Sequence, residues 1–396
     1  MADPQDFEQH LTQPIGDLDE LRALLPITRI GLYLDHAAAG VLPQTTVDAM
    51  TIRIRSAATH GIRHWNVWQK LVQRTRRLTA ELVGSHEDEI AFGPNTSAGI
   101  GTIAEGFPWQ AGNNVVLSSS EFPSNRFPWL NLKRRDVEVR QVDTPDDPKD
   151  FISALDQACD SQTRILACSW VDYATGVRRD PERLADVAHR HKALLVLDVI
   201  QGFGVLPLDF GAQQIDVLVA DGRKWLLGPE GAGLLVVRRD KQDLFEITRP
   251  GWASTTSPLD FGAAQLMLSE TATRFESGMH NTFGLSGLHA SLRLLRDITP
   301  AARAERLLSV RGEFEKAGRL AGLECPAWPE PAQSGILTFR HPRLESAAVI
   351  RQLRSQNITV SLKNDHIRVS PHLYNDADDA QQFADAVSRL TIRHPA

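Results

Sequence analysis

The chain has 396 residues, which is too long for one ordinary hydrophobic core, so two domains are expected. Its hydrophobic content of 42% and charged content of 23% are typical of a globular protein, and no apolar run reaches the length of a membrane span. The formal net charge of −6 gives no electrostatic case for nucleic-acid binding.

The cysteines Cys159, Cys168 and Cys325 cannot all pair, and their spacing is not that of metal ligands. They fit a reducing compartment better than a disulfide framework, so no metal site is predicted. The first residues are acidic and polar, unlike a secretory signal. These features predict a cytoplasmic protein without membrane association.

Short apolar runs alternate with helical patterns from about residue 90 to 240. The strand candidates are residues 114–117, 164–169, 193–197, 215–220 and 233–237. Because these runs are continuously apolar, they indicate a sheet that is buried on both faces. Residues 180–191 are predicted to form a connecting helix. This order predicts an α/β fold with a large, doubly wound, mainly parallel sheet.

The pattern changes after about residue 285. Helices are predicted at 285–295, 301–320, 346–355 and from 376, and short strands at 335–339, 358–360 and 367–369. This is an α+β pattern. We therefore predict a large domain over residues 31–285 and a smaller C-terminal domain over residues 286–396, against which residues 1–30 pack.

A lysine and a carboxylate follow two consecutive strand candidates. Asp198 and Gln201 come after the run 193–197, and Lys224 comes after the run 215–220. Ligands bind beyond the carboxyl ends of strands in open parallel sheets. Pyridoxal phosphate chemistry requires a lysine for the Schiff base and a carboxylate that keeps the pyridine nitrogen protonated. Gln201 could donate to the phenolic oxygen, and Arg223 is a cation that would lower the pKa of Lys224.

The cofactor's phosphate and ring need further groups. Residues 93–100 supply a turn, Asn95, two hydroxyls at Thr96 and Ser97, and then a helical stretch, which suits a phosphate. Phe122 follows the strand candidate at 114–117 and could stack on the pyridine ring.

Each residue has a plainer interpretation. Asp198, Thr96 and Ser97 could be helix caps, Phe122 could be core packing, and Arg223 could merely pair with the aspartate two residues before it. The order of hydroxyl turn, aromatic residue, Asp-x-x-Gln and lysine favours the cofactor site.

With these residues the chain resembles the class-V aminotransferase family of pyridoxal phosphate enzymes, which includes cysteine desulfurases, selenocysteine lyases, kynureninases and isopenicillin N epimerase-like proteins. The resemblance runs from residues 33–40 to residues 368–372. It implies the fold-type-I transferase architecture, a small amino-acid substrate and a homodimer. Within it, Thr96 matches the phosphate-binding threonine, and Arg368 matches the arginine that grips the substrate's α-carboxylate.

Several positions depart from the family pattern. Asp221 stands where desulfurases usually have a hydroxyl residue, and Arg223 replaces a histidine. Met279 stands where relatives often have a threonine that reaches a neighbouring subunit's phosphate. Met279 cannot make that contact, but His280 or Asn281 could substitute.

Two departures concern the desulfurase reaction. Phe122 replaces the histidine that desulfurases stack on the ring, as in kynureninase-like members. The loop at residues 358–368 has no cysteine, although the desulfurase nucleophile normally lies there. The resemblance therefore argues against a persulfide-forming desulfurase.

The leading hypothesis is an enzyme of α-amino acids with aminotransferase-type or C–S lyase-type chemistry. Lys224 would act as general base, and Asp198 would stabilise the electron sink. The alanine-rich turn with His36 and Ala38 lies where the family closes the substrate pocket, and Tyr173 is a further candidate for that pocket. The alternatives are an epimerase of the same family and a catalytically inactive binding or regulatory protein.

Overall fold

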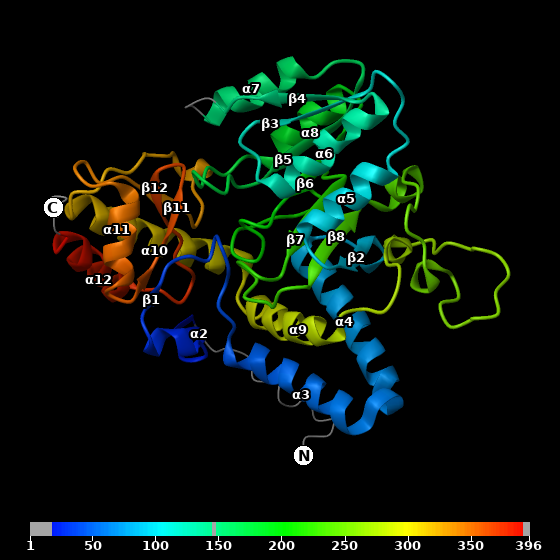
Figure 1. Ribbon diagram of the computed structural model, residues 1–396, viewed down its shortest axis with the longest axis horizontal. Helices are drawn as coiled ribbons and strands as arrows, with labels where there is room; N and C mark the ends of the chain where they lie inside the picture. Colours follow the sequence, from blue (N-terminus) through cyan, green and yellow to red (C-terminus); the bar gives the residue numbers. More distant parts are fainter. Residues whose placement is uncertain (1–17, 145–147, 391–396) are drawn as a thin grey trace.

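The computed structural model describes residues 18–144 and 148–390. Within them, a seven-stranded sheet has the order β2-β8-β7-β6-β5-β3-β4 (Figure 1). Neighbouring strands from β4 to β7 are parallel, whereas β8 is antiparallel to both of its neighbours. The strands are β2 (Ile90–Gly93), β3 (Asn114–Ser118), β4 (Glu138–Val142), β5 (Thr163–Ser169), β6 (Leu194–Asp198), β7 (Val217–Asp221) and β8 (Gly233–Val237). The predicted mainly parallel α/β sheet is confirmed.

Both faces of this sheet are covered by helices. On β5, Ile165 and Ala167 join the core beneath α5 (Thr96–Gly106) and α6 (Phe127–Leu130). Leu166 and Cys168, which point the other way, join the core beneath α7 (Pro148–Ala158) and α8 (Pro181–Arg190). Successive residues of a strand face opposite sides, so burial on both sides requires a continuously apolar strand. This explains the apolar runs in the sequence.

Long helices complete the large layer and connect it to the smaller part. Helix α9 (Thr282–Arg296) packs against α3 (Gln44–His60) and α4 (Trp65–Val83). Helix α10 (Pro300–Leu320) packs instead against α12 (Ala377–Ser388) and β9 (Leu337–Phe339). The predicted boundary at residues 285 and 286 thus falls inside α9. The division into domains stays a prediction, and the packing favours a break between α9 and α10.

The smaller part contains an antiparallel sheet of order β11-β12-β9. Its remaining elements are α11 (Ser346–Arg354), β10 (Ile358–Thr359), β11 (Ser361–Lys363) and β12 (His366–Val369). Strand β1 (Leu32–Tyr33) pairs with β10. On α2 (Leu18–Ala23), Arg22 donates to both carboxylate oxygens of Asp379 at 2.7 and 3.0 Å. The described part of the N-terminal segment therefore contacts the smaller part, while residues 1–17 lie outside the described residues.

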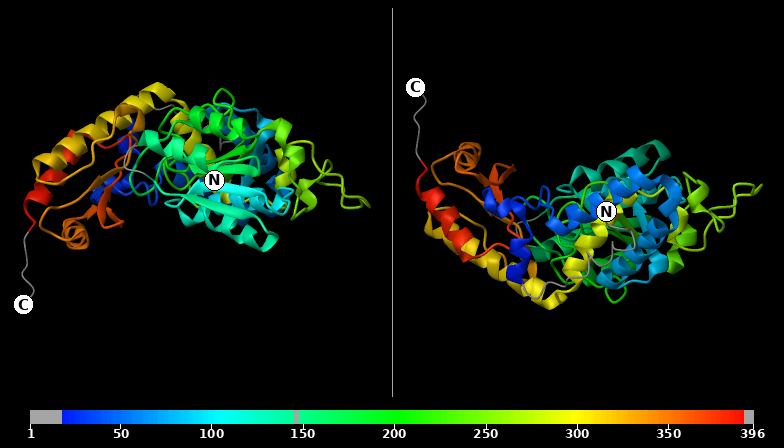
Figure 2. Two further views of the ribbon diagram at one scale, coloured as in Figure 1. Left: turned by 90° about the horizontal axis from the view of Figure 1, so that it is seen from above. Right: turned by 90° about the horizontal axis from the view of Figure 1, so that it is seen from below.

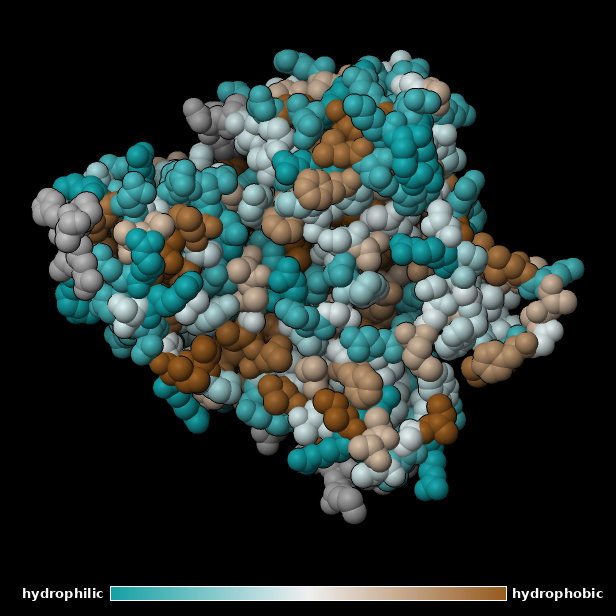
Figure 3. Space-filling view, viewed as in Figure 1, coloured by the Kyte–Doolittle hydropathy of each residue, from teal (hydrophilic) through white to brown (hydrophobic). Residues whose placement is uncertain are grey.

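A loop at residues 255–268 projects from the end of the molecule opposite the smaller part (Figure 2). Apolar residues lie open on this loop at the right edge of Figure 3. The exposed large side chains there are Leu259, Phe261, Leu266 and Met267. Of the helices within the described ranges, none combines the length and apolar character needed to cross a membrane.

Candidate active site

A cavity of about 180 Å³ opens at the carboxyl ends of β5, β6 and β7. All the predicted site residues except His36, Ala38 and Arg368 line it. The lining residues are Asn95, Thr96, Ser97, Phe122, Ser124, Ser169, Tyr173, Asp198, Ile200, Gln201, Asp221, Arg223 and Lys224. Segments that are more than a hundred residues apart in the chain thus meet in one cavity.

Lys224 lies just after β7 and is only 5% exposed. Burial, and then the nearby Arg223 guanidinium, hold the pKa of this lysine well below its ordinary value. Its Nζ lies 5.7 Å from the centre of the Phe122 ring. A buried amine that loses its proton easily is a nucleophile and a base near neutral pH.

Asp198 ends β6 in the same cavity. Burial raises the pKa of this carboxyl, although one oxygen accepts a hydrogen bond from the backbone N–H of Ile200 at 3.0 Å. A protonated pyridine nitrogen bound beside Asp198 would favour the charged carboxylate, which is the form that the predicted pairing with the ring requires. Gln201 donates one N–H to the carbonyl of Ala37 and accepts from the indole of Trp225. Its second N–H is left for an acceptor in the cavity.

The N-terminus of α5 forms one end of the cavity. Asn95 caps the helix by accepting from the backbone N–H of Ala98 at 2.9 Å. Ser97 donates to Ser124 at 2.7 Å. The buried hydroxyl of Thr96 has no hydrogen-bond partner among the described residues. Backbone N–H groups of a helix start and an unpartnered hydroxyl fit a phosphate.

Arg368 lies on β12 outside the cavity lining and is 1% exposed. Its guanidinium donates to Asp35 at 3.1 Å, to the carbonyl of Tyr173 at 2.8 Å and to the hydroxyl of Ser361 at 3.2 Å. Since an arginine has five N–H donors, two of them make no hydrogen bond among the described residues. The sequence contained no signal for the ion pair with Asp35, because the two residues are 333 positions apart in the chain and come together only in the folded protein.

His36 is fully buried behind the alanine-rich turn. Its Nδ1 lies 3.0 Å from the carbonyl of Ser370, and its Nε2 lies 3.1 Å from the hydroxyl of Tyr374. Burial keeps the pKa of this imidazole well below its ordinary value. The carbonyl of Ala38 accepts from Arg223 at 3.1 Å. The burial of His36 does not support its predicted contact with substrate. Ala38 is partly exposed, and its predicted contact with substrate stays a prediction.

Two residues behind the cavity were missed by the sequence reasoning. Glu121 accepts from the backbone N–H of Ser169 at 2.8 Å and also from its hydroxyl. Arg179 donates to the carbonyl of Ser169 at 2.7 Å. Ser169 itself pairs in register with Asp198. The only local signal for Glu121 in the sequence was its place directly before Phe122.

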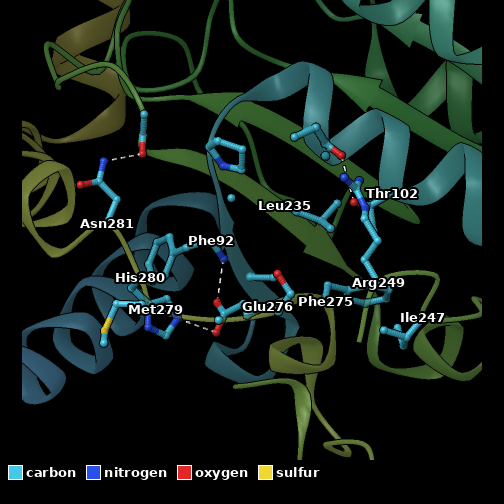
Figure 4. A pocket seen from close by; sticks show the side chains of 18 of the residues that line it. Phe92, Thr102, Leu235, Ile247, Arg249, Phe275, Glu276, Met279, His280 and Asn281 are labelled. Atoms are coloured by element: carbon cyan, nitrogen blue, oxygen red, sulfur yellow. Dashed lines mark hydrogen bonds and ion pairs between the residues drawn. The ribbon is translucent and has the colours of Figure 1, made fainter. Parts of the chain in front are cut away.

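A larger cavity of about 440 Å³ lies on the other side of the turn before α5 (Figure 4). Glu276 on its wall accepts from the backbone N–H of Phe92 and lies 2.8 Å from Nε2 of His280. Asn281 donates to the carbonyl of Gly231 and caps α9. His280 and Asn281 are thus engaged within their own chain. The larger cavity lacks a lysine, so the smaller one is the candidate active site.

A sequence model of the family described as aminotransferase class-V matches residues 32–383. A probable cysteine desulfurase of Methanothermobacter thermautotrophicus is 26% identical over 94% of this chain and 98% of that protein. Isopenicillin N epimerase of Amycolatopsis lactamdurans is 26% identical over 90% of this chain and 94% of that protein.

Among solved structures, a cystine C–S lyase in complex with its reaction product cysteine persulfide has a TM-score of 0.84 to this chain. The two are 23% identical, and the similarity covers 91% of this chain and 97% of the lyase. This likeness confirms the predicted fold.

Proposed function

The chain belongs to the class-V aminotransferase family, and we propose that it acts on an α-amino acid with aminotransferase-type or C–S lyase-type chemistry. It is a pyridoxal phosphate-dependent enzyme, as its family is. The observation that carries the proposal is the meeting of Lys224 and Asp198 in one buried cavity, each with a pKa displaced toward neutrality.

The cavity suits the cofactor at both ends. Thr96 and the start of α5 would hold its phosphate, and Asp198 and Gln201 would hold its ring. When bound, pyridoxal phosphate supplies an electron sink for a negative charge at the substrate's α-carbon. Lys224 takes and returns the proton at that carbon, since its amine is buried and easily deprotonated.

Arg368 would receive the substrate's α-carboxylate with its two remaining N–H groups. Because the ion pair with Asp35 already fixes the guanidinium plane, little side-chain entropy is lost on binding. Tyr173 lines the cavity, and its carbonyl holds Arg368.

We further propose that sulfur is not taken up as a persulfide on a cysteine of this protein. Burial raises the pKa of Cys168 to about 12, and that of Cys159 and Cys325 to about 11. Such thiols are poor nucleophiles at neutral pH. None of the three lies among the residues that line the candidate active site. A leaving thiol of a substrate would therefore depart into solution.

Epimerisation is the second candidate, supported by the similarity to isopenicillin N epimerase. That reaction needs an acid on the face opposite Lys224. The phenol of Tyr173 is the candidate, because it lines the cavity beside the ring of Phe122, with ring centres 5.2 Å apart.

We also propose a homodimer in the cytoplasm. The projecting loop at residues 255–268 exposes large apolar side chains that a second copy would cover. Met279 is 61% exposed, and its side chain has no donor for the phosphate of a partner subunit. All three cysteines are free thiols, which suits a reducing compartment. Sedimentation and cell fractionation test these two points.

The test of the proposed function is the visible absorbance of the protein with pyridoxal phosphate, alongside Lys224→Ala. We expect a band in the wild type that borohydride abolishes and that the variant lacks. Incubation with L-cystine and with other amino acids, with and without a 2-oxo acid, would then separate release of pyruvate, amino transfer and inversion at the α-carbon.

Mass spectrometry of the protein after reaction with L-cysteine checks the sulfur proposal. A persulfide on any of the three cysteines would contradict it. A wild-type protein that forms no absorbance band would contradict the role of Lys224.

A further inference from the structure

Arg179 is a buried arginine behind the candidate active site that the proposed chemistry does not use. It is 5% exposed, and its guanidinium lies over the ring of Phe151 at 4.4 Å. Its Nε has no hydrogen-bond partner among the described residues, whereas Nη1 and Nη2 form ion pairs with the buried carboxylates of Glu121 and Asp172 at 3.9 and 3.5 Å. Burying the unpartnered Nε–H destabilises the folded protein, and the two ion pairs offset the burial of the charge.

Arg179 is connected to Asp198 through hydrogen bonds of Ser169. Its Nη1 donates to the carbonyl of Ser169 at 2.7 Å, and Glu121 accepts from both the N–H and the hydroxyl of the same serine. Every polar group of Ser169 is thereby held. Ser169 is the register partner of Asp198, and the N–H of the next residue, Trp170, donates to the carbonyl of Asp198 at 2.8 Å. A shift of Ser169 would therefore shift Asp198.

Arg179 is connected to Arg368 through Asp172 and the carbonyl of Tyr173. Nη2 lies 3.5 Å from a carboxylate oxygen of Asp172. The other oxygen of Asp172 accepts from the N–H groups of Ala174 and Thr175 at 2.9 and 2.8 Å, which closes a tight turn. This turn presents the carbonyl of Tyr173 to Arg368 at 2.8 Å. The turn that Asp172 closes thus supplies one of the three hydrogen-bond partners of the Arg368 guanidinium.

We propose that Arg179 is a positioning residue that aligns the two ends of the active site, Asp198 through Ser169 and Arg368 through Tyr173. A planar guanidinium suits this task, because its donors lie in fixed directions and contact two segments at once. The assignment of the two ends as ring partner and carboxylate partner rests on the proposed function. The connection of Ser169 and Tyr173 through Arg179 does not rest on that function.

The test compares Arg179→Lys with Arg311→Lys. Arg311 on α10 is also buried and has an unpartnered Nε, but it pairs with Glu315 and contacts neither end of the cavity. Amide hydrogen exchange is measured on the full chain without cofactor, in peptides covering residues 169–176 and 366–369. In Arg179→Lys we expect exchange to rise about tenfold or more in both peptides, because local opening becomes easier. In Arg311→Lys both peptides should exchange as in the wild type.

Two further variants each break one connection and serve if Arg179→Lys does not fold. Glu121→Gln should raise the amide exchange of residue 169 and leave the exchange of residues 366–369 unchanged. Asp172→Asn should loosen residues 172–176 and 366–369 and leave residue 169 unchanged. Exchange that rises uniformly along the chain, or equally in Arg179→Lys and Arg311→Lys, would overturn the proposal and leave Arg179 a structural residue.

A second readout uses added pyridoxal phosphate. If the wild type shows the absorbance band, Arg179→Lys should shift the wavelength of that band and Arg311→Lys should not. An unshifted band in Arg179→Lys would overturn the coupling to Asp198. If the wild type shows no band, the proposed function fails, and the exchange experiment still decides the positioning role.

Discussion

Gly40 lies directly against the backbone of Lys224. A Cβ atom at position 40 would lie 3.1 Å from the carbonyl carbon of Lys224 and would overlap its oxygen. The N–H of Gly40 donates to the carbonyl of Arg223 at 2.7 Å. The turn that begins at Asp35 and the loop that carries Lys224 are thus packed without room for a side chain at position 40.

Gly40→Ala is therefore expected to destabilise the protein by about 1–3 kcal/mol, because the two backbones must move apart. The displaced lysine should also capture pyridoxal phosphate more slowly. Urea unfolding and the rate of band formation measure both effects. Gly312→Ala on α10 is the control, since a Cβ there meets nothing within 4 Å, and it should stabilise the helix by about 0.5–1 kcal/mol. Equal stabilities of Gly40→Ala and wild type would contradict the close approach.

Removing the Thr96 hydroxyl should weaken cofactor binding without weakening the protein. Because this buried hydroxyl has no partner among the described residues, Thr96→Ala should leave the unfolding free energy of the cofactor-free protein unchanged or slightly raised. Its Kd for pyridoxal phosphate should rise about tenfold, or about 1.4 kcal/mol, through loss of a hydrogen bond to a charged group. Thr96→Ser keeps the hydroxyl and should retain the affinity. A large loss of stability in Thr96→Ala would show a structural role instead.

Arg223→Gln should shift the pH dependence of cofactor capture to higher pH. The positive charge of Arg223 lowers the pKa of Lys224, so its removal raises that pKa and leaves less free amine at a given pH. The side chain of Arg223 is 32% exposed and partly screened, so the expected shift of the midpoint is about half a pH unit. The rate of band formation is measured from pH 6 to pH 9. Arg239→Gln, at an exposed ion pair with Asp88, should leave the midpoint unchanged. A shift to lower pH would contradict the electrostatic role.

The buried ion pair of Arg76 and Glu276 should be essential for stability. Nη2 of Arg76 contacts both carboxylate oxygens of Glu276 at 2.9 and 3.0 Å, and both side chains are almost fully buried. Glu276→Ala leaves a buried guanidinium unpaired and is expected to cost about 3–5 kcal/mol in urea unfolding.

The matched control is the exposed pair of Arg77 and Glu87, with a distance of 2.8 Å between Nε and the carboxylate. Glu87→Ala should cost less than about 1 kcal/mol. Similar losses in the two variants would mean that burial does not set the strength of these pairs.

Much of the fold was predictable from local sequence patterns. The apolar runs near residues 114, 164, 193, 215 and 233 all proved to be strands, because a strand covered on both faces has no polar side to show. The cofactor followed from Lys224 and Asp198, since Asp198 ends one such strand and Lys224 lies in the turn after the next. The boundary at residue 285 was placed inside α9, because an amphipathic helix gives no sign of which layer it covers.

The roles within the site were less predictable. His36 was expected to contact substrate, yet it is sealed behind its turn by Ser370 and Tyr374, which lie more than 330 residues further along the chain. The ion pair of Asp35 and Arg368 spans a similar separation. Neither the contacts of His36 nor this ion pair can be predicted from the spacing of residues in the sequence.

The sequence by itself determined the α/β architecture and the pyridoxal phosphate cofactor, and it predicted the lysine that would hold the cofactor. All three depend on residues close to one another in the chain or placed at strand ends, where local periodicity gives the position. Only the tertiary structure decided which buried groups meet: Asp35 with Arg368, Glu276 with Arg76, and Arg179 with Ser169 and Asp172. Such pairings depend on how distant segments pack, and burial strengthens the interactions that hold them.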